Sequence, residues 1–485
     1  LLPGVDSTGS LLLNYPLGEL TSHVVGYIGR ISERELQEID ATAYAGTDHI
    51  GKSGLEKSYE SQLLGEVGVQ QAEINASGRI ARILETEPPV GGNDLHLHLD
   101  VRLQRVATDA LGEHTGSVVA IDPVTGGVLA LVSHPGFDPN PFVEGISHRD
   151  YAALRDDRRV PLFNRAIQGS YPPGSTVKPF IGLDGLEKNA VTPLQTTWCP
   201  GQFKLKGSRR VFRDWKRGGH GHVDLDKAIT QSCDVYFYDL AYSMGIDSLH
   251  DYLSQFGFGS PTGVDLPLET SAVLPSKLWK QGRYGQVWLP GDTVNAGIGQ
   301  GYFQTSPMQL AYATAVLAAG GKRLEPLLVA RAGSQETTPG DGDIEQIPWR
   351  SADNWHRILE AMVNVVETGT ARRIRTDNYR IAGKTGTAQV VSMKQNEEYD
   401  ETKLAKEKHD HALFISFAPA DDPRIAVAVI VENGGHGGAT AAPVAGRVMD
   451  YYLGEILGMF PLDPDPESPA AITTADTQSV PETTD

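Results

Sequence analysis

The sequence predicts an α/β (α+β) fold in which a smaller N-terminal domain precedes a larger mixed domain. Apolar, β-branched segments occur near both ends of the larger region, at 116–133, 411–419 and 425–433, and helical patterns fill the chain between them. The stretch ETEPPVGGND at 85–94 carries two prolines and two glycines and is typical of a linker. Strands at both ends with helices between them favour one mixed sheet assembled from the two ends of the domain.

The N-terminal region, 1–94, is polar, with strand-like runs at 22–29 and 78–85 and a charged helical pattern at 31–40. The strictly alternating LHLHLD at 95–100 predicts a strand that opens the second domain, which we place at 95–460. Residues 461–485 are rich in Pro, Asp, Glu, Ser and Thr, and we expect a disordered acidic tail there.

Within the larger region, GSVVAIDPVTGGVLALVS at 116–133 predicts a β-hairpin. Two apolar arms flank DPVTGG, in which proline takes the second place of the turn and glycines follow. Helical patterns follow at 179–188, 225–244 and 306–320. The chain is therefore expected to alternate between strands at its ends and helices in its middle.

Charge and composition narrow the class of function. The formal net charge is −19 with no dense Lys/Arg run, which argues against nucleic acid or an anionic membrane surface as the main partner. No run of 18 apolar residues occurs, so no segment of this sequence is expected to span a bilayer. The chain begins with LLPGVDSTGS, without an initiator Met, and we expect truncation upstream with any anchor lost there.

One short stretch, YPPGSTVKPF at 171–180, carries a candidate nucleophile. Prolines and a glycine precede Ser175 and predict the start of a helix, where Lys178 falls on the same face as Ser175. An alcohol is a weak nucleophile until a base takes its proton, and a lysine can act as that base only when it is neutral. A Ser and a Lys three apart also occur by chance, so the pair alone is weak support.

Two further motifs follow in a fixed order. TQSCDVYFYDL begins at 230 and places Ser232 and Asp234 around Cys233 at a helix start. RIAGKTGTAQV at 380–390 places Lys384, Thr385, Gly386 and Thr387 in a short polar strand, although KTG alone could equally be a turn. The order Ser-x-x-Lys, Ser-x-Asp, Lys-Thr-Gly is more specific than any one of its parts.

With these three motifs the chain resembles the penicillin-binding proteins and serine β-lactamases. Within them it is similar to the class B transpeptidases of the cell-elongation type, the penicillin-binding protein 2 family. Flanking stretches at 54–68, 263–270 and 295–311 agree. The resemblance implies a penicillin-binding (serine β-lactamase-like) transpeptidase domain on an elongated N-terminal pedestal of the dimerisation type.

The resemblance also implies residue roles. Ser175 would be acylated, Lys178 would take its proton, Ser232 would relay a proton to the leaving amine, and Lys384 would tune the electrostatics of Lys178. Thr385 and Thr387 would bind the terminal carboxylate of the substrate, and Gly386 would leave room for its backbone. The N–H groups of Ser175 and Thr387 would form the oxyanion hole.

The middle motif departs from the usual Ser-x-Asn pattern, because Asp234 stands where an asparagine is expected. An ionised carboxylate only accepts hydrogen bonds, whereas an amide also donates. We therefore expect Asp234 to pair with a lysine or a backbone N–H, which leaves its contact with a substrate carbonyl open.

The two cysteines, Cys199 and Cys233, bracket Asp214, His220 and His222. Cys199, Asp214, His220 and Cys233 could supply the S, O, N and S ligands of a tetrahedral structural zinc site. A disulfide, or two small buried residues, are the alternatives from spacing alone. The resemblance favours zinc, and it favours His220 over His222 as the third ligand.

The implied function is a peptidoglycan D,D-transpeptidase that cross-links stem peptides ending in D-Ala-D-Ala during elongation and is inhibited by β-lactams. A D,D-carboxypeptidase and a β-lactam sensor without turnover are the alternatives. A β-lactamase is disfavoured, since no asparagine follows Glu269 and an extra domain is present. The implied partner is a membrane glycan polymerase of the shape, elongation, division and sporulation family, on the periplasmic side of the inner membrane.

Overall fold

The computed structural model describes residues 12–76, 80–337, 345–390 and 404–462. Of the predicted acidic tail, residues 463–485 lie outside this part of the chain. Residues 391–403, in the charged stretch that follows the Lys-Thr-Gly motif in the sequence, lie outside it as well. None of the helices in the described part combines the length and the apolar character that a membrane span requires.

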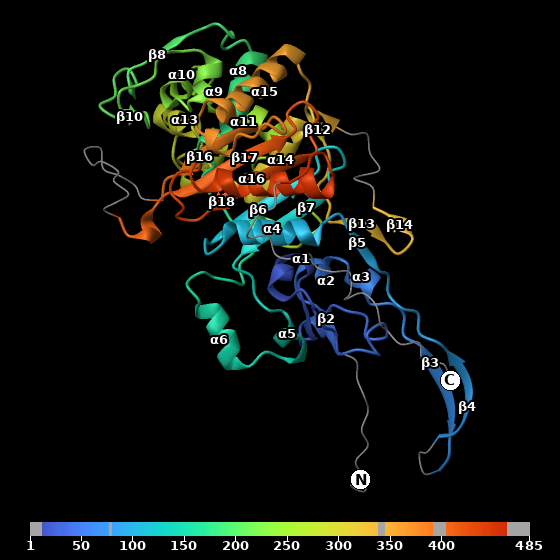
Figure 1. Ribbon diagram of the computed structural model, residues 1–485. Helices are drawn as coiled ribbons and strands as arrows, with labels where there is room; N and C mark the ends of the chain where they lie inside the picture. The colour runs from blue at the N-terminus through green and yellow to red at the C-terminus, as the bar shows by residue number, and fades with distance from the viewer. Residues whose placement is uncertain (1–11, 77–79, 338–344, 391–403, 463–485) are drawn as a thin grey trace.

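A five-stranded antiparallel sheet forms the centre of the larger domain (Figure 1). Its strands, in the order β16-β17-β18-β6-β7, are β16 Ala382–Ala388, β17 His411–Ala418, β18 Ile425–Val431, β6 Gly116–Ile121 and β7 Val128–His134. Strands β6 and β7 are the predicted hairpin, and β17 and β18 are the two predicted C-terminal strands. The sheet is thus assembled from both ends of the domain, as predicted, and β16 is an edge strand. The sheet is not mixed as expected, because all of its strand pairs are antiparallel.

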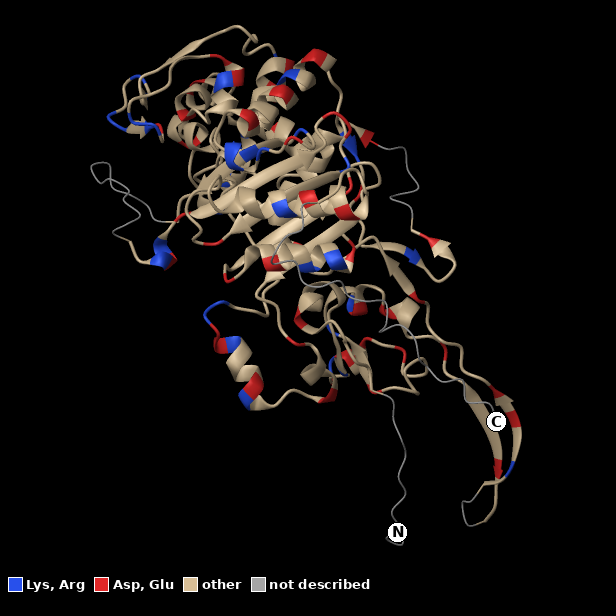
Figure 2. Cartoon of the chain, in the orientation of Figure 1, with Lys and Arg blue, Asp and Glu red and all other residues tan. Residues whose placement is uncertain are grey.

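Helices cover both faces of this sheet. All residues of β6 and β18 are buried, which requires cover above and below. Helices α4 (Val101–Leu111) and α16 (Ala441–Tyr451) pack on each other and on one face, while α14 (Pro307–Ala318) packs on the other. Figure 2 accordingly shows the sheet almost without charged residues.

A group of helices packs at the β16 end of the sheet and carries two of the three motifs. Its members are α8 Lys178–Glu187, α9 Leu225–Thr230, α10 Asp234–Met244, α11 Ile246–Leu253, α13 Pro290–Ala296 and α15 Ala352–Glu367. The helical pattern predicted over 225–244 is two helices, α9 and α10, and the helix start predicted at the Ser-x-Asp motif is confirmed. The chain leaves the helical conformation at Ser232, whose φ is +56°, and α10 starts afresh at Asp234.

Short elements complete the larger domain. They are the strands β5 Leu95–Leu97, β8 Thr197–Cys199, β9 Gln202–Lys204, β10 Val211–Arg213, β11 Gly221–Val223, β12 Lys322–Arg323, β13 Val329–Ala332, β14 Gln335–Glu336 and β15 Glu345–Gln346, and the helices α7 Arg165–Gln168 and α12 Lys277–Tyr284. Strand β8 pairs with β11, and β9 pairs with β10. Together these two strand pairs order the part of the chain between Cys199 and Cys233.

The N-terminal region has little regular structure. It comprises α1 Ser22–Val25, β1 Ile28–Arg30, β2 His49–Gly51, α2 Gly54–Ser58, α3 Glu60–Leu63, β3 Val69–Ile74 and β4 Ile80–Glu87. Half of the expected strand at 22–29 is the helix α1, and only its last two residues belong to a strand, β1. The expected helix at 31–40 is a single 3-10 turn at Glu35–Gln37. Figure 1 shows β3 and β4 as a two-stranded ribbon that projects away from the rest of the molecule.

A segment of the larger region lies beside the N-terminal elements. Helices α5 (Asn140–Glu144) and α6 (His148–Asp156) extend next to β2 in Figure 1. The Tyr15 N–H donates to Asn140 Oδ1 over 2.8 Å, and His49 Nε2 lies 2.9 Å from the Val143 carbonyl oxygen. The two regions are therefore tied by contacts that no local sequence pattern announces.

Candidate active site and metal centre

The candidate nucleophile lies in a tight turn at the start of a buried helix. Ser175 is part of one turn of 3-10 helix, Gly174–Val177, and Lys178 is the first residue of α8. Pro179 fits this first turn, where backbone N–H groups have no helical partner. The Ser175 residue is partly exposed, whereas Lys178 is completely buried. The hydroxyl-bearing residue Ser175 is thus partly accessible to solvent, whereas the amine of Lys178 is shielded from it.

The amine of Lys178 is held by the Ser-x-Asp motif. Its Nζ lies 2.7 Å from Asp234 Oδ1 and donates to the Ser232 carbonyl oxygen over 2.9 Å and to Ser232 Oγ over 3.2 Å. Because an ammonium has three donors and no acceptor, these contacts occupy it fully. No hydrogen bond joins Ser175 Oγ to Lys178 among the described residues. The structure therefore brings Lys178, Ser232 and Asp234 together directly and places Ser175 one helical turn away in sequence.

Asp234 accepts hydrogen bonds on both oxygens. Oδ1 takes Lys178, and Oδ2 accepts the backbone N–H of Trp215 over 3.0 Å. Both partners expected for this acid, a lysine and a backbone N–H, are present. A carboxylate suits this position, because both contacts of Asp234 are with donors and a carboxylate only accepts. Both of its oxygens are therefore engaged within the protein.

The Lys-Thr-Gly motif lies on the edge strand β16. Lys384 is fully buried, and burial, together with the nearby charge of Lys178, holds the pKa of its amine well below the ordinary value. Thr385 Oγ1 lies 2.6 Å from Thr370 Oγ1, while Thr387 is partly exposed. A Cβ on Gly386 would lie 2.8 Å from Thr176 Cγ2, so only glycine lets the strand pass this close to the serine turn.

A loop at 297–303 is hydrogen-bonded to both the serine turn and β16, and none of the sequence motifs predicted this role. The Gly174 N–H donates to the Gly299 carbonyl oxygen over 2.9 Å, and Gln300 Nε2 donates to the Thr387 carbonyl oxygen over 2.9 Å. Gly299 has φ +70°, and a Cβ there would lie 2.2 Å from the Gly174 oxygen. The GQG spacing at 299–301 was the available signal, since adjacent glycines mark close backbone approach.

Four residues predicted as metal ligands converge in the structure. The ligand atoms of Cys199, Asp214, His220 and Cys233 all lie within 4.8 Å of one another, and all four residues are buried. Cys199 is the last residue of β8, Asp214 follows β10, His220 precedes β11 and Cys233 precedes α10. His222, the alternative third ligand, is exposed and its ring contacts Trp198 at 4.9 Å. The two cysteines are free thiols, so no disulfide joins them.

The spacing of the four donors suits a tetrahedral metal. Cys199 Sγ lies 3.5 Å from both Asp214 Oδ2 and His220 Nδ1, Cys233 Sγ lies 3.4 Å from Asp214 Oδ2, and His220 Nδ1 lies 3.4 Å from Asp214 Oδ1. Zinc–ligand bonds of about 2.0–2.3 Å imply donor–donor edges of roughly 3.3–3.8 Å in a tetrahedron. Burial and the Asp214 carboxylate raise the pKa of the Cys233 thiol, which means that its thiolate form is disfavoured there. A cation among the ligands would favour the thiolate.

Glu269, considered as a deacylating base of the β-lactamase type, is committed to its own loop. Its carboxylate accepts the Thr262 N–H over 2.8 Å, the Thr262 hydroxyl over 2.7 Å and the Gly263 N–H over 3.1 Å. These bonds explain its presence as a loop cap. No contact of Glu269 with the three motifs is found in the described part of the chain.

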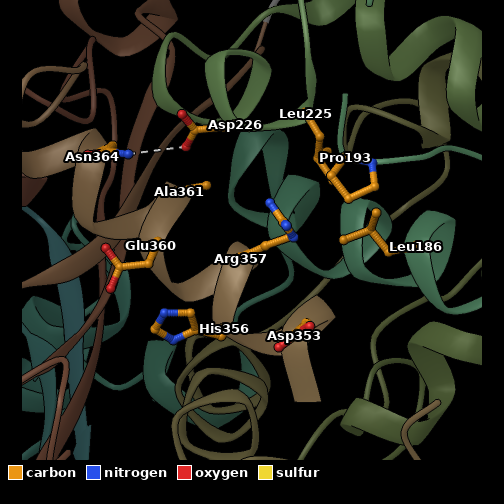
Figure 3. A pocket seen from close by; sticks show the side chains of 10 residues that line it. All are labelled: Leu186, Pro193, Leu225, Asp226, Asp353, His356, Arg357, Glu360, Ala361 and Asn364. Atoms are coloured by element: carbon orange, nitrogen blue, oxygen red, sulfur yellow. Dashed lines mark hydrogen bonds between the residues drawn. The ribbon is translucent and has the colours of Figure 1, made fainter. Parts of the chain in front are cut away.

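A cavity of about 470 Å³ lies apart from the motifs, between α8, α9 and α15 (Figure 3). Figure 3 shows Asn364 pointing to Asp226, with which it forms a 3.2 Å hydrogen bond. The lining residues are Leu186, Pro193, Leu225, Asp226, Asp353, His356, Arg357, Glu360, Ala361 and Asn364. None of them belongs to a motif, so the candidate active site is the convergence at β16 and not this cavity.

Family models place the chain. The penicillin-binding protein transpeptidase domain matches residues 116–450, and the penicillin-binding protein dimerisation domain matches residues 1–97. The chain therefore belongs to the penicillin-binding protein transpeptidase family. The mixed fold on an N-terminal dimerisation-type domain, predicted from the sequence, is confirmed.

Similar proteins narrow the subgroup. The peptidoglycan D,D-transpeptidase MrdA of Acinetobacter baumannii is 49% identical over 453 residues, 93% of this chain and 67% of that protein. The MrdA of Escherichia coli K12 is 40% identical over 492 residues, 98% of this chain and 76% of that protein. The structure of Pseudomonas aeruginosa PBP2 in complex with WCK 5153 superposes with a TM-score of 0.83 at 44% identity, covering 92% of both chains. The predicted kinship with penicillin-binding protein 2 is confirmed.

Proposed function

We propose that this chain is a peptidoglycan D,D-transpeptidase that cross-links stem peptides through an ester on Ser175. The observation that carries the proposal is the convergence of all three motifs around one shielded amine. Lys178 bonds to Ser232 and Asp234, and burial together with the charge of Lys178 lowers the pKa of Lys384 on the adjacent edge strand. The relatives named D,D-transpeptidases over most of the chain support the same reaction.

In the first half-reaction Ser175 Oγ attacks the carbonyl carbon of the bond between the two terminal D-alanines. The hydroxyl proton passes to Lys178 Nζ as that amine gives one of its own protons to Ser232 Oγ. The C–N bond breaks as the leaving nitrogen takes the proton of the Ser232 hydroxyl, so Lys178 and Ser232 end with the protons they began with. Ser232 Oγ lies 3.2 Å from Lys178 Nζ, within reach of such a relay. The products are free D-alanine and an ester on Ser175.

The edge strand β16 is suited to hold the donor peptide. An extended peptide can add to an unpaired strand edge by main-chain hydrogen bonds. Thr387 is partly exposed there, and its N–H, together with that of Ser175, is proposed to bind the oxyanion. Removing one such donor costs about 3–4 kcal/mol of transition-state stabilisation in other enzymes. Thr385 is proposed to bind the peptide carboxylate beside its Thr370 contact.

In the second half-reaction an amine of a neighbouring stem peptide attacks the ester carbon. The ester C–O bond breaks, the amine loses a proton through the same relay, and Ser175 regains its hydroxyl hydrogen. If water attacked instead, the chain would be a D,D-carboxypeptidase. Incubation with two stem peptides separates these activities, since cross-linked dimer is expected as the main product. Trimmed monomer alone would support the carboxypeptidase, and an ester that never turns over would support the sensor.

We propose that zinc occupies the Cys199, Asp214, His220 and Cys233 cluster as a structural ion. When bound, it would balance two of the three negative charges carried by the two buried thiolates and the Asp214 carboxylate. The donor spacing and the burial of all four ligands support this assignment. Since Cys233 lies inside the Ser-x-Asp motif, the same ligands fix the start of α10 beside Lys178.

We propose a membrane glycan polymerase as a partner, met through the N-terminal domain on the periplasmic side of the inner membrane. Helicobacter pylori PBP2 has been solved with MreC, and another similar structure concerns a complex that coordinates polymerisation and cross-linking. The projecting β3–β4 ribbon supports a protein contact, because Val69, Ile74, Ile80 and Ile83 are exposed on it. Ile74→Glu with Ile83→Glu should abolish co-purification with the polymerase but leave acylation unchanged, whereas undiminished co-purification would contradict this surface.

A further inference from the structure

Trp215 combines an exposed ring with an inward hydrogen bond. Its residue is 59% exposed, although tryptophan is usually largely buried. Its indole Nε1–H nevertheless donates to the Ser232 carbonyl oxygen over 3.1 Å and to the Gln231 carbonyl oxygen over 3.2 Å. The residue therefore gains little from burial and is directed at the backbone of the proposed proton relay.

The dipeptide Asp214–Trp215 clamps the whole Ser-x-Asp segment. Asp214 Oδ2 accepts the N–H groups of Asp234 over 2.8 Å and Val235 over 3.1 Å, which caps the start of α10. The Trp215 N–H donates to Asp234 Oδ2 over 3.0 Å. One residue of the dipeptide thus faces the cysteine cluster, and its neighbour faces the motif.

Ser232 needs such support, because its backbone is strained. A φ of +56° is rare for any residue other than glycine and costs on the order of 1–3 kcal/mol unless the surroundings impose it. The Ser232 carbonyl oxygen accepts only two side-chain donors in the described part of the chain, Lys178 Nζ and Trp215 Nε1. Lys178 is itself a proposed reactant, so Trp215 is the donor that stays in place while protons move.

We propose that Trp215 is a positioning residue for the acylation step, acting through the Ser232 carbonyl to hold the Ser232 hydroxyl against Lys178. The proposal deepens the proposed function and rests on the roles given to Ser175 and Ser232. It also explains why the cysteine cluster lies beside the motif: the cluster fixes Asp214, and Asp214 fixes the next residue. Substrate specificity has no part in this role, so the rate of the chemical step is affected and binding is not.

The test compares Trp215→Phe with Trp198→Phe in acylation by a fluorescent penicillin. Trp198 is a matched control, because it is also 59% exposed and lies in the same region, but its ring contacts His222 instead of the motif. Phe at 215 keeps a ring beside His220, whose ring lies 5.6 Å from that of Trp215, and removes the N–H. We expect about a tenfold fall in the first-order acylation constant for Trp215→Phe, the effect of one lost hydrogen bond. The dissociation constant of the initial complex should be unchanged, and Trp198→Phe should match the wild type.

Two measurements separate positioning from general damage. Metal content and melting temperature should be the same in both variants. If Trp215→Phe loses metal or stability, the test uses a tryptophan isostere at 215 in which sulfur replaces the indole N–H. The same tenfold fall in the acylation constant with this isostere supports the proposal. A wild-type acylation constant in Trp215→Phe or in the sulfur-containing isostere at 215, or a loss confined to initial binding, would overturn it. Ser175→Ala, which should not acylate at all, tests the proposed function separately.

Discussion

The amine nitrogen of Lys178 lies 2.7 Å from Oδ1 of Asp234, and this ion pair is almost fully shielded from water. The acid that replaces the usual asparagine is therefore the partner of the proposed base. A residue that departs from the motif of the wider family is in this chain part of the same hydrogen-bonded group as the residues that match it. The effect of an acid at 234 in place of the usual asparagine can therefore be tested by removing the charge of its side chain.

Asp234→Asn should lower the free energy of unfolding by about 3 kcal/mol, since removing one member of a buried ion pair leaves the other charge uncompensated. Its amide nitrogen would also face the Trp215 N–H, two donors without an acceptor. Denaturant unfolding checks the value. Asp239→Asn, at an exposed position of the same helix, is the control and should change it by less than about 0.5 kcal/mol. Equal effects of the two substitutions would contradict the ion pair as a stabilising contact.

Gly299→Ala should abolish acylation and lower the melting temperature, because a Cβ there meets the Gly174 oxygen at 2.2 Å and φ is +70°. The serine turn would have to move away from β16. Gly282→Ala is the matched control, since a Cβ at this position of α12 meets nothing within 4 Å. That change should be neutral or stabilise by up to about 1 kcal/mol. Normal acylation by Gly299→Ala would show that the loop does not fix the serine turn.

The sequence predicted the central sheet and the motif residues, but not how the pieces are joined. Continuous apolar runs predicted β6, β7, β17 and β18 correctly, because a strand that is buried on both faces is apolar at nearly every position. The helical pattern over 225–244 and the new helix start at the Ser-x-Asp motif were predicted, but no local signal marks the strained φ of Ser232 between the two helices. Trp215 and Thr370 were missed for a related reason: each acts through one contact with a residue distant in sequence. Such contacts exist only after folding, whereas the Lys-Thr-Gly and Ser-x-x-Lys spacings are local.

Metal removal should loosen the Ser-x-Asp segment. We expect about one equivalent of zinc in the purified chain, and His220→Asn should lose it, with a lower melting temperature and slower acylation. His222→Asn should keep the metal, because His222 is exposed and outside the cluster. Elemental analysis with thermal unfolding checks both. Full zinc occupancy in His220→Asn, or its loss in His222→Asn, would reassign the ligand.

Stability should fall in mild acid because of His23, which is partly buried where α1 meets the larger domain, its ring 5.4 Å from that of Phe137. Burial lowers the pKa of His23 to about 4, while an unfolded histidine titrates near 6.5. Between these values the unfolded chain binds the extra proton, so its contribution to stability is present above pH 6.5 and is lost as the pH falls toward 4. The loss is about 3 kcal/mol from the size of the shift.

His23→Leu should remove that part of the pH dependence. Unfolding free energies of the wild type and the variant, measured by urea titration between pH 4 and 7, check it. Parallel curves would show that His23 does not titrate on unfolding in this range.

The most direct test of the account is the intact mass of the protein after incubation with a β-lactam, followed by peptide mapping. We expect one covalent adduct, on Ser175, which is absent from Ser175→Ala and greatly slowed in Lys178→Met although both variants stay folded. An adduct on another residue, or undiminished labelling of Ser175→Ala, would contradict the central claim that this serine, activated by the buried amine, carries the acyl group.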